Sequence, residues 1–455
     1  MSEVKVNKIS PRSGTTVTLG DSGDTFTIPS GATINNQGTA TNFGATGSAS
    51  WVTTVKTSTF TAVAGEGYFV NTTGGAITVN LPAGVAGAVV AIKDYANTFD
   101  TNAVTVSPNG SDKIGGINTS DGILTTEGIA VTFVFVDSTQ GWLVTDSGLQ
   151  NELPTAQFVT ATGGNAVLTC SDFKIHVFTG PGTFCVSEAG NSGGSNTVDY
   201  MVVAGGGGGG GHSSAGGGGG GGFRESPGAA SGCYTASPLG TSPAVALPVS
   251  VQGYPIAVGG GGPGGPGSSP GLGTNGSNSS FSTITSAGGG GGGAWPSPDN
   301  GNPGGSGGGA GNSNTEGTGN QPPVNPPQGQ PGQGGNNTCG GGGGGGATAA
   351  GSTGSAPNNG GPGGAGATTA ITTSSSYGEA TPTPGRAYAG GGGGRGGAPA
   401  TRAQGGLGGG GNGNLDSSGG DHGTTNTGGG GGGNGSSSSG ANGGSGIVII
   451  RYKFQ

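Results

Sequence analysis

The chain has 455 residues, of which 29% are hydrophobic and only 7% charged, and its net charge of −8 lies entirely before Gly205. The absence of a basic face argues against nucleic-acid binding. No apolar run is long enough for a membrane-spanning helix, which argues against membrane insertion, and the polar segment Met1–Ser10 does not have the pattern of a secretory signal.

Residues 1–50 are short β-forming pieces separated by turn signals, such as TTVTLG and TFTIPSGATI. Thr alternates in them with Val, Ile, Leu or Phe, which is the period of a strand. One chain could bury little apolar surface in this way, whereas three chains around a common axis could cover it mutually. We expect a homotrimeric β-prism or triple β-helix here, and a disordered N-terminal arm is the alternative.

Residues 51–150 have the most conventional globular pattern and predict a small β-sandwich or barrel. Apolar strand-like stretches alternate with turn signals such as Pro-Asn-Gly at 108–110. In the stretch AVTFVFV, Val131, Phe133 and Phe135 fall on one face, and the opposite face is also apolar, which is typical of a central buried strand. We expect Trp142 to cap the core rather than to bind sugar.

Residues 151–204 are predicted to form strands that link this domain to the rest of the chain. We expect these strands to build a base sheet, and the closing segment 447–455 to pair with it through Ile447–Phe454. His176 alternates with Lys174 and Phe178 on one such strand, so we interpret it as a packing or solvent-side residue rather than a ligand.

The four cysteines, Cys170, Cys185, Cys233 and Cys339, include no CxxC pair, which argues against a metal site. Folding in a reducing compartment favours free, buried thiols. A bridge between Cys170 and Cys185, on neighbouring predicted strands, is the alternative.

Residues 205–446 are dominated by glycine. Pure runs, with interrupted ones between them, lie at 205–211, 216–222, 259–267, 288–293, 304–311, 340–346, 360–366, 390–394, 405–411 and 428–433. Ordering a glycine costs more backbone entropy than ordering any other residue, so a flexible linker is one interpretation. The other is a bundle of polyglycine-II helices, which have three residues per turn and can hydrogen-bond to neighbours on every side.

Three observations favour the bundle. The runs have similar lengths, two apolar strands bracket the block, and the intervening segments contain aromatic residues such as Trp295 and Tyr388. The predicted fold is therefore all-β up to residue 204, followed by a polyglycine-II bundle framed by strands, with essentially no α-helix.

If each of the ten runs crosses the bundle once, alternate loops lie at its far end. This assigns to the far end the loops 212–215, 268–286, 312–331, 367–389 and 412–427, and to the base the loops 223–257, 294–303, 347–359, 398–404 and 434–442. The far-end loops are polar with isolated anchors that suit contact with a glycan or a protein loop. The candidate receptor-binding residues are His212, Phe281, Tyr377, Arg386, Tyr388, Asp416 and His422.

The sequence contains no convincing catalytic, cofactor-binding or metal-binding pattern. Asp421 and His422 have serines nearby but lack the rigid strand–turn–helix that a nucleophile needs. The acidic residues of the glycine block are too dispersed to form the carboxylate pair of a glycosidase. We therefore expect a protein that is not an enzyme and has no cofactor.

The segments DFKIHVFTGPGTF, VDYMVVAGGGGGGG and GGSGIVIIRYKF resemble the glycine-rich C-terminal domain of marine bacteriophage tail fibres. Packed polyglycine helices are also similar to the tip adhesins of T-even-like phages. The resemblance covers about Phe173 to the C-terminus. It implies a virion fibre protein that recognises the host surface through far-end loops. It also implies a homotrimer that docks through Met1–Arg12 to a baseplate or tail component.

The ligand implied is a surface glycan or an outer-membrane protein. A structural fibre whose glycine block is only a spacer or cap is the main alternative. A tailspike that carries an enzyme is a third.

Overall fold

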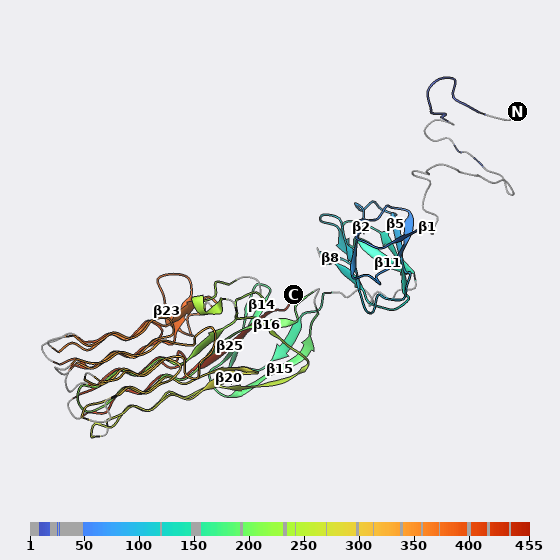
Figure 1. The fold of residues 1–455 in the computed structure, drawn as a ribbon. Coiled ribbons are helices and arrows are strands. Elements are labelled where there is room, and N and C mark those ends of the chain that lie inside the picture. Colours follow the sequence, from blue (N-terminus) through green and yellow to red (C-terminus); the bar gives the residue numbers. More distant parts are fainter. Residues whose placement is uncertain are drawn as a thin grey trace.

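The computed structural model describes residues 9–18, 25, 27, 49–118, 121–146, 156–191, 194–230, 234–241, 243–269, 271–296, 300–312, 314–336, 340–355, 358–372, 374–397, 402–415, 419–435 and 438–455. They form two folded parts, which are considered separately (Figure 1). The predicted all-β class is confirmed. The helix found in the described residues is a single 3₁₀ turn, η2 (Pro238–Gly240), and none there could cross a membrane. Most of the predicted trimeric segment 1–50 lies outside the described residues.

The first part is a sandwich of two sheets. The seven-stranded sheet has the order β1 (Ser50–Lys56), β3 (Glu66–Val70), β5 (Val89–Asp94), β10 (Ala130–Phe135), β11 (Trp142–Asp146), β7 (Lys113–Ile114) and β8 (Ile117–Asn118). The four-stranded sheet has the order β2 (Phe60–Thr61), β4 (Ile77–Asn80), β6 (Val104–Ser107) and β9 (Gly122–Leu124).

The chain alternates between these two sheets, so their first strands pair in parallel. β1, β3 and β5 are parallel neighbours in one sheet, and β2, β4 and β6 are parallel neighbours in the other. The antiparallel strands β10 and β11 then extend the larger sheet, and β7 and β8 complete it. The sequence predicted the sandwich but not this winding, because parallel and antiparallel strands share the same two-residue side-chain period.

The predicted core face of β10 is confirmed. Val131, Phe133 and Phe135 are buried in the core, together with Trp142, whose ring meets the edge of Phe135 at a centroid distance of 5.5 Å. The opposite face of β10 is only partly buried, so the expectation that both faces are covered is wrong there.

The second part begins with another sandwich, which forms the base of the glycine block. One sheet has the order β12 (Val159–Thr162), β15 (Gly182–Ala189), β19 (Gln252–Ala257), β20 (Ser279–Phe281) and β21 (Ile284–Ser286). The other has the order β13 (Ala166–Cys170), β14 (Phe173–Phe178), β25 (Ile447–Lys453), β16 (Thr197–Val203) and β17 (Phe223–Glu225), with β18 (Leu247–Pro248) on β16.

The closing strand pairs with the base as predicted. β25 lies between β14 and β16 and is antiparallel to both, so the chain leaves the base and returns to the same sheet. His176 is buried on β14, where its Nδ1 lies 2.7 Å from the Gly163 carbonyl oxygen and its Nε2 lies 3.1 Å from the Tyr452 hydroxyl. Its interpretation as a packing residue is therefore confirmed.

Cys170 and Cys185 are free thiols, as expected, but both are exposed rather than buried. Cys185 lies on β15 between Phe184 and Val186, whose side chains fill the core, so alternation directs the thiol outward. Cys170 ends β13, an outermost strand of its sheet.

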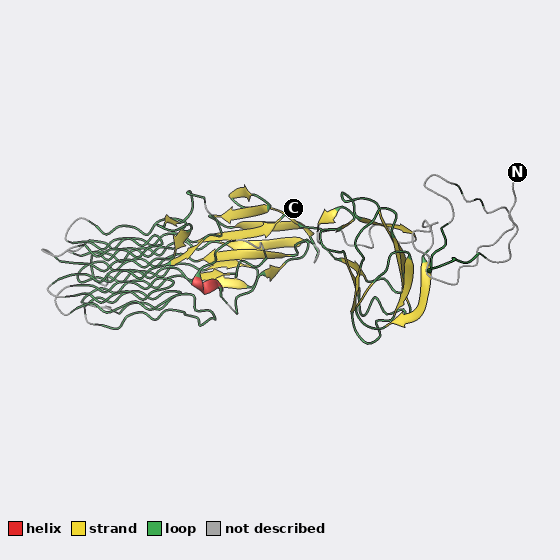
Figure 2. Ribbon diagram, turned by 90° about the horizontal axis from the view of Figure 1, so that it is seen from above, coloured by secondary structure: helices red, strands yellow, loops and turns green. Residues whose placement is uncertain are grey.

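Extended glycine segments run from this base to the opposite end of the second part, here called the far end (Figure 2). We call each such run a crossing. The crossing 205–211 is buried throughout, and its N–H groups donate in a three-residue repeat to segments 271–277, 441–444 and 216–219. Its carbonyl groups accept from segments 262–265, 289–292 and 431–434. Three residues per turn and bonding only to neighbours define a polyglycine-II helix inside a hexagonal array.

Crossings at the outer surface show the same repeat in a different form. In segment 259–267, Gly262 and Gly265 are buried and donate to the carbonyls of Gly206 and Gly209. The exposed third position carries Gly260, Pro263 and Pro266. Proline lacks an N–H but fits the φ of this helix, so it is tolerated where no neighbour needs a donor.

The bundle contains more crossings than the ten runs rich in glycine, so the parity prediction is wrong in part. Segment 439–446 is one that was missed: its Gly440, Gly443 and Gly446 donate to Gly265, Gly262 and Gly259 at 2.7–2.9 Å. Such surface crossings need glycine only on their inner side, and polar residues fill the rest.

Candidate functional site

Antiparallel hydrogen bonds between successive crossings identify the loops at the far end. Gly207 bonds Gly219 and Gly210 bonds Gly216, so residues 212–215 turn at the end away from the sheets. The same reasoning places at the far end the described residues 267–269, 295–296, 300, 312, 314, 336, 355, 358–359, 396–397, 415, 435 and 438.

Two of the predicted anchors are misplaced. Phe281 and Tyr388 have no exposed surface; they lie on β20 and on β24 (Arg386–Tyr388), strands at the base. Loop 367–389 as a whole belongs to the base, where β24 pairs with β22 (Ala367–Thr369) and β23 (Glu379–Ala380). Phe281 packs into the core cluster between the two sheets of the base, and Tyr388 packs into a second cluster beside it.

Tyr377 and Arg386 also lie in this base loop, so their assignment to the far end is wrong. The Arg386 guanidinium donates to backbone carbonyls of Ser375, Tyr377 and Gly378, which fixes the loop on itself. It is therefore engaged in holding its own loop. Asp416 lies outside the described residues.

His212 lies at the far end as predicted. It lies next to Trp295, which the parity prediction had placed at the base. Its Nδ1 lies 3.2 Å from the carbonyl oxygen of Trp295, and the Trp295 N–H donates to Ser213. Trp295 is 47% exposed. The sequence does carry a signal for the far-end position of Trp295, because the glycine run 288–293 ends in Ala-Trp-Pro. A large ring cannot fit inside the close-packed bundle, so a crossing that ends at one has reached the surface.

Backbone hydrogen bonds connect this pair and its neighbouring loops to the rest of the far end. The His212 N–H donates to the Ser438 carbonyl, and the Arg395 N–H donates to Ala215. The Arg395 side chain covers Gly435, and the buried Asn434 accepts a hydrogen bond from Asn414 and donates to the carbonyl of Ser439. We call His212, Trp295, Arg395, Asn434 and Ser438 the far-end patch.

His422 is exposed on the side of a crossing, where its Nδ1 accepts a hydrogen bond from the Asn442 N–H. Beside it, Arg402 forms a 2.6 Å ion pair with Asp421. Partial burial acts to raise the pKa of Asp421, but hydrogen bonds from Arg402 and Asn412 outweigh it and lower the pKa below its usual value. This pair secures two neighbouring crossings near the far end.

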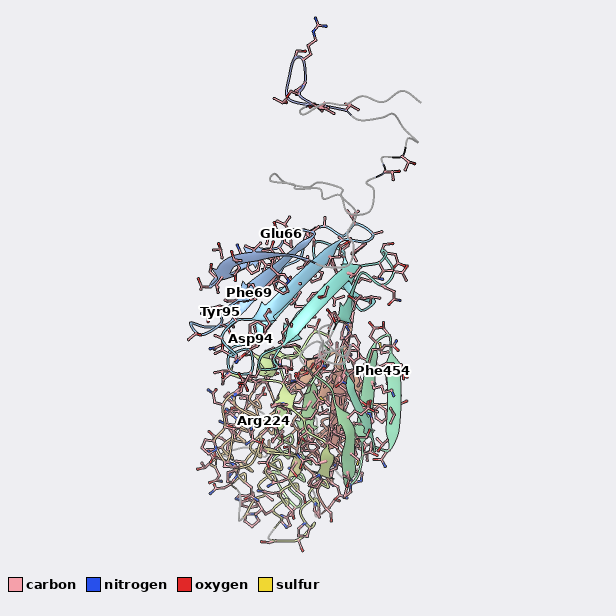
Figure 3. The ribbon with its side chains drawn as sticks, turned by 90° about the vertical axis from the view of Figure 1, so that its right-hand side faces the viewer. Glu66, Phe69, Asp94, Tyr95, Arg224 and Phe454 are labelled. Atoms are coloured by element: carbon pink, nitrogen blue, oxygen red, sulfur yellow. The ribbon has the colours of Figure 1, made fainter. Side chains whose placement is uncertain are left out.

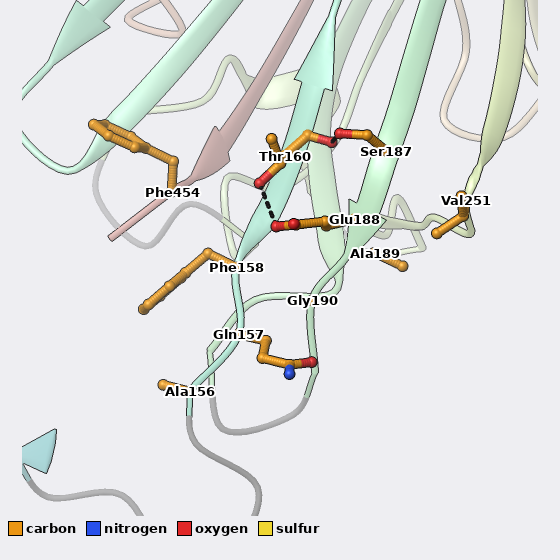
Figure 4. Close-up of a pocket in the computed structure, with 10 residues that line it drawn as sticks. All are labelled: Ala156, Gln157, Phe158, Thr160, Ser187, Glu188, Ala189, Gly190, Val251 and Phe454. Atoms are coloured by element: carbon orange, nitrogen blue, oxygen red, sulfur yellow. Dashed lines mark hydrogen bonds between the residues drawn. The ribbon is translucent and has the colours of Figure 1, made fainter. Parts of the chain in front are cut away.

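A wide hollow of about 570 Å³ lies on the base sandwich (Figure 4). Phe158 and Phe454 border it, and Glu188 accepts a hydrogen bond from the Thr160 hydroxyl at 2.9 Å. Lys453 lies over the ring of Phe158 and Lys174 over that of Phe454. Each of these rings therefore has a lysine ammonium group over one of its faces.

A buried acid, Glu225, connects three segments of the base. Its carboxylate accepts hydrogen bonds from the Ser237 N–H at 2.8 Å and from the Thr369 hydroxyl. Burial raises its pKa to about 7, although these hydrogen bonds oppose the shift. These partners belong to the loop at 237 and to strand β22. Glu225 therefore holds these two segments together.

The far-end patch offers an exposed indole beside a partly exposed imidazole, and these groups can stack on and hydrogen-bond to a surface ligand. The described residues contain no group of three or more His, Cys, Asp or Glu side chains that could hold a metal ion.

The sequence model of one protein family, described as a glycine-rich domain, matches residues 179–453. No curated protein matches the chain.

Proposed function

Because this chain belongs to the glycine-rich domain family, we propose that it uses the bundle as a rigid frame for surface recognition, as the tail-fibre protein of a tailed bacteriophage. One observation carries the proposal: Trp295, a large ring, is 47% exposed at the end of a buried crossing. Such a ring is a common anchor in binding surfaces because it buries a large area with few rotatable bonds.

The frame supports this role. Each crossing at the centre of the bundle is hydrogen-bonded to its neighbours, and the far-end patch is bonded directly to these crossings. Loops held in this way lose less conformational entropy when they bind. The far-end sequences can therefore vary without disturbing the glycine lattice that supports them.

The likeness of the sequence to marine phage tail fibres supplies the rest of the proposal. Residues 1–50 would trimerise and attach the protein to a baseplate or tail component of the virion. The far end would bind a host surface glycan or an outer-membrane protein loop. Three far ends per fibre, and several fibres per virion, would combine weak contacts through effective concentration. The proposed role requires neither catalysis nor a cofactor.

The experiment is a cell-binding assay with fluorescently labelled full-length protein on a panel of marine Gram-negative bacteria. On the strains that the native protein labels, Trp295→Ala is expected to reduce labelling at least ten-fold. The matched control is Trp51→Ala, which removes a ring of similar exposure, 43%, from the first folded part. Both variants must elute and melt like the native protein.

Equal labelling by native protein and Trp295→Ala would reject the far-end patch as the receptor site. A native protein that assembles into fibres but labels no strain would favour the other candidate, a structural fibre whose glycine block is a spacer or cap.

A further inference from the structure

A second, smaller cavity lies where the base sandwich meets the bundle, away from the far-end patch. Its volume is about 200 Å³. Strands β17 and β21, the residue before β20, the turn between β20 and β21, and the loop before crossing 328–335 contribute to it. Its lining combines one cation with hydroxyl and amide groups, and no acidic side chain lines it.

The cation is Arg224, labelled in Figure 3. Its neighbours on β17, Phe223 and Glu225, are buried on the opposite side of the strand, so alternation turns the Arg224 side chain toward the cavity. Among the described residues, its guanidinium has no hydrogen bond and no ion pair, although it is only partly exposed. The five N–H donors of the guanidinium are thus available to a ligand.

Side chains of two kinds complete the cavity. Asn278, Thr283 and Thr285 line it with polar groups, and Pro322 and Val324 form an apolar wall. The polar groups lie with the guanidinium in the lining of one small space. A planar guanidinium beside hydroxyl groups is well suited to a carboxylate or a phosphate, because it donates two parallel hydrogen bonds to either.

Hydrogen bonds within the protein hold the cavity wall formed by Pro322 and Val324 in place without a ligand. Gln328 is 1% exposed; its backbone carbonyl accepts from Phe223, and its side chain accepts from the Ala287 N–H and donates to the Pro322 carbonyl. Asn320 accepts from the N–H groups of Val324 and Gln328. One buried residue, Gln328, therefore connects β17, the end of β21 and the loop, so their spacing is preset.

We propose that this cavity is a binding site for a small ligand bearing one oxyanion, a carboxylate or a phosphate group, held by Arg224. The volume is below the roughly 300–1,000 Å³ of most ligand pockets, so it admits a ligand the size of one sugar unit. An acidic monosaccharide fits the whole lining, because its carboxylate meets Arg224 and its carbon face meets Pro322 and Val324. Free phosphate fits the polar half alone.

The test is isothermal titration of full-length protein at low ionic strength, in a buffer without phosphate or carboxylate. The probes are glucuronate, inorganic phosphate and glucose, which lacks a charge. Glucuronate is expected to bind, and glucose is not. Binding of phosphate but not of glucuronate would support the oxyanion site and identify phosphate as the ligand class.

Arg224→Gln is expected to weaken binding at least ten-fold, and Arg224→Lys by less, because lysine keeps the charge but loses the paired donors. Arg402→Gln is the matched control, since it removes a cation near the far end. If Arg224→Gln fails to fold, Thr283→Val with Thr285→Val is expected to weaken binding instead. Absence of binding by both anions, or unchanged affinity in folded Arg224→Gln, would overturn the proposal. Trp295→Ala leaves this cavity intact. The oxyanion proposal and the receptor-binding proposal are therefore tested separately, and either can fail without the other.

Discussion

Gly207 faces Gly290 so closely that a Cβ atom on Gly207 would lie 2.2 Å from the Gly290 carbonyl oxygen. The same relationship joins Gly218 to Gly207, at 2.1 Å, and recurs through the buried crossings. Glycine is required there by the close approach of neighbouring backbones rather than by a left-handed backbone conformation. The carbonyls cannot move aside, because each already accepts a hydrogen bond from a third crossing.

Gly207→Ala should therefore destabilise the bundle strongly. Because the methyl group would force neighbouring crossings apart, we expect the free energy of unfolding to fall by about 2–3 kcal/mol or more. Denaturant unfolding followed by circular dichroism measures this. Gly260→Ala is the control, since a Cβ there meets no atom within 4 Å, and a change within about 0.5 kcal/mol is expected. Equal losses in the two variants would contradict the close-packed lattice.

The exposed face of an outer crossing should accept proline, whereas its inner face should not. The Gly262 N–H donates to the Gly206 carbonyl at 2.8 Å, so Gly262→Pro removes a buried hydrogen bond and adds a ring against a neighbour. Its free energy of unfolding should fall by roughly 2 kcal/mol or more.

Gly260→Pro should instead raise it by about 0.4–1 kcal/mol, because the φ of proline suits this helix and the unfolded chain loses entropy. Thermal melts of the two variants side by side measure the difference. A lower melting temperature for Gly260→Pro than for Gly262→Pro would show that the exposed and buried faces have been reversed.

The sequence predicted the interior of the bundle better than its surface. A crossing with six neighbours needs glycine at every position, so segments such as 216–222 can be recognised directly. A surface crossing needs glycine only at every third residue, as at Gly440, Gly443 and Gly446, and resembles an ordinary polar loop. Missing such crossings shifted the parity of the loops that follow.

That shift explains which of the predicted receptor-binding residues lie at the far end and which do not. The turn that contains His212 follows the first crossing, so its position did not depend on counting. Trp295 was assigned to the base, and Tyr388 to the far end, because each comes after crossings that were missed. Burial of Phe281 and Tyr388 could not be read from the sequence, since Phe281 stands among serines and Tyr388 between two alanines, and tertiary packing decides which ring is covered.

Tyr388→Phe separates a structural from a receptor-binding role for this residue. Its hydroxyl is buried and has no hydrogen-bond partner among the described residues, so removing it leaves no group unsatisfied. The free energy of unfolding should stay the same or rise by up to about 1 kcal/mol, and cell binding should not change.

Tyr254→Phe is the comparison, because the Tyr254 hydroxyl accepts a hydrogen bond from the Ser250 N–H at 2.8 Å. A loss of about 1 kcal/mol is expected there. Chemical denaturation of both variants gives the answer, and a larger loss for Tyr388→Phe than for Tyr254→Phe would mean that the buried hydroxyl does have a partner.

The buried acid Glu225 should make the stability of the second folded part depend on pH. Its pKa is raised from an ordinary 4.5 to about 7 in the folded state, mainly by burial. Between these values the folded state binds more protons than the unfolded state, so stability falls as pH rises. The contribution of Glu225 is fully present below about pH 4.5 and is lost through about pH 7. A shift of this size corresponds to a loss on the order of 3 kcal/mol.

Glu225→Gln should remove this slope, because the amide is neutral at every pH and its oxygen can still accept from the Ser237 N–H. The measurement is the free energy of unfolding at intervals from pH 4 to pH 8 for both proteins. Near pH 8 the variant should be the more stable of the two, since the native protein then buries a charged carboxylate.

Asp421→Asn is a control of opposite sign. The pKa of Asp421 is lowered in the folded state, so that substitution should remove stability at neutral pH rather than add it. Parallel pH profiles for native protein and Glu225→Gln would show that the carboxyl group does not titrate between pH 4.5 and pH 7.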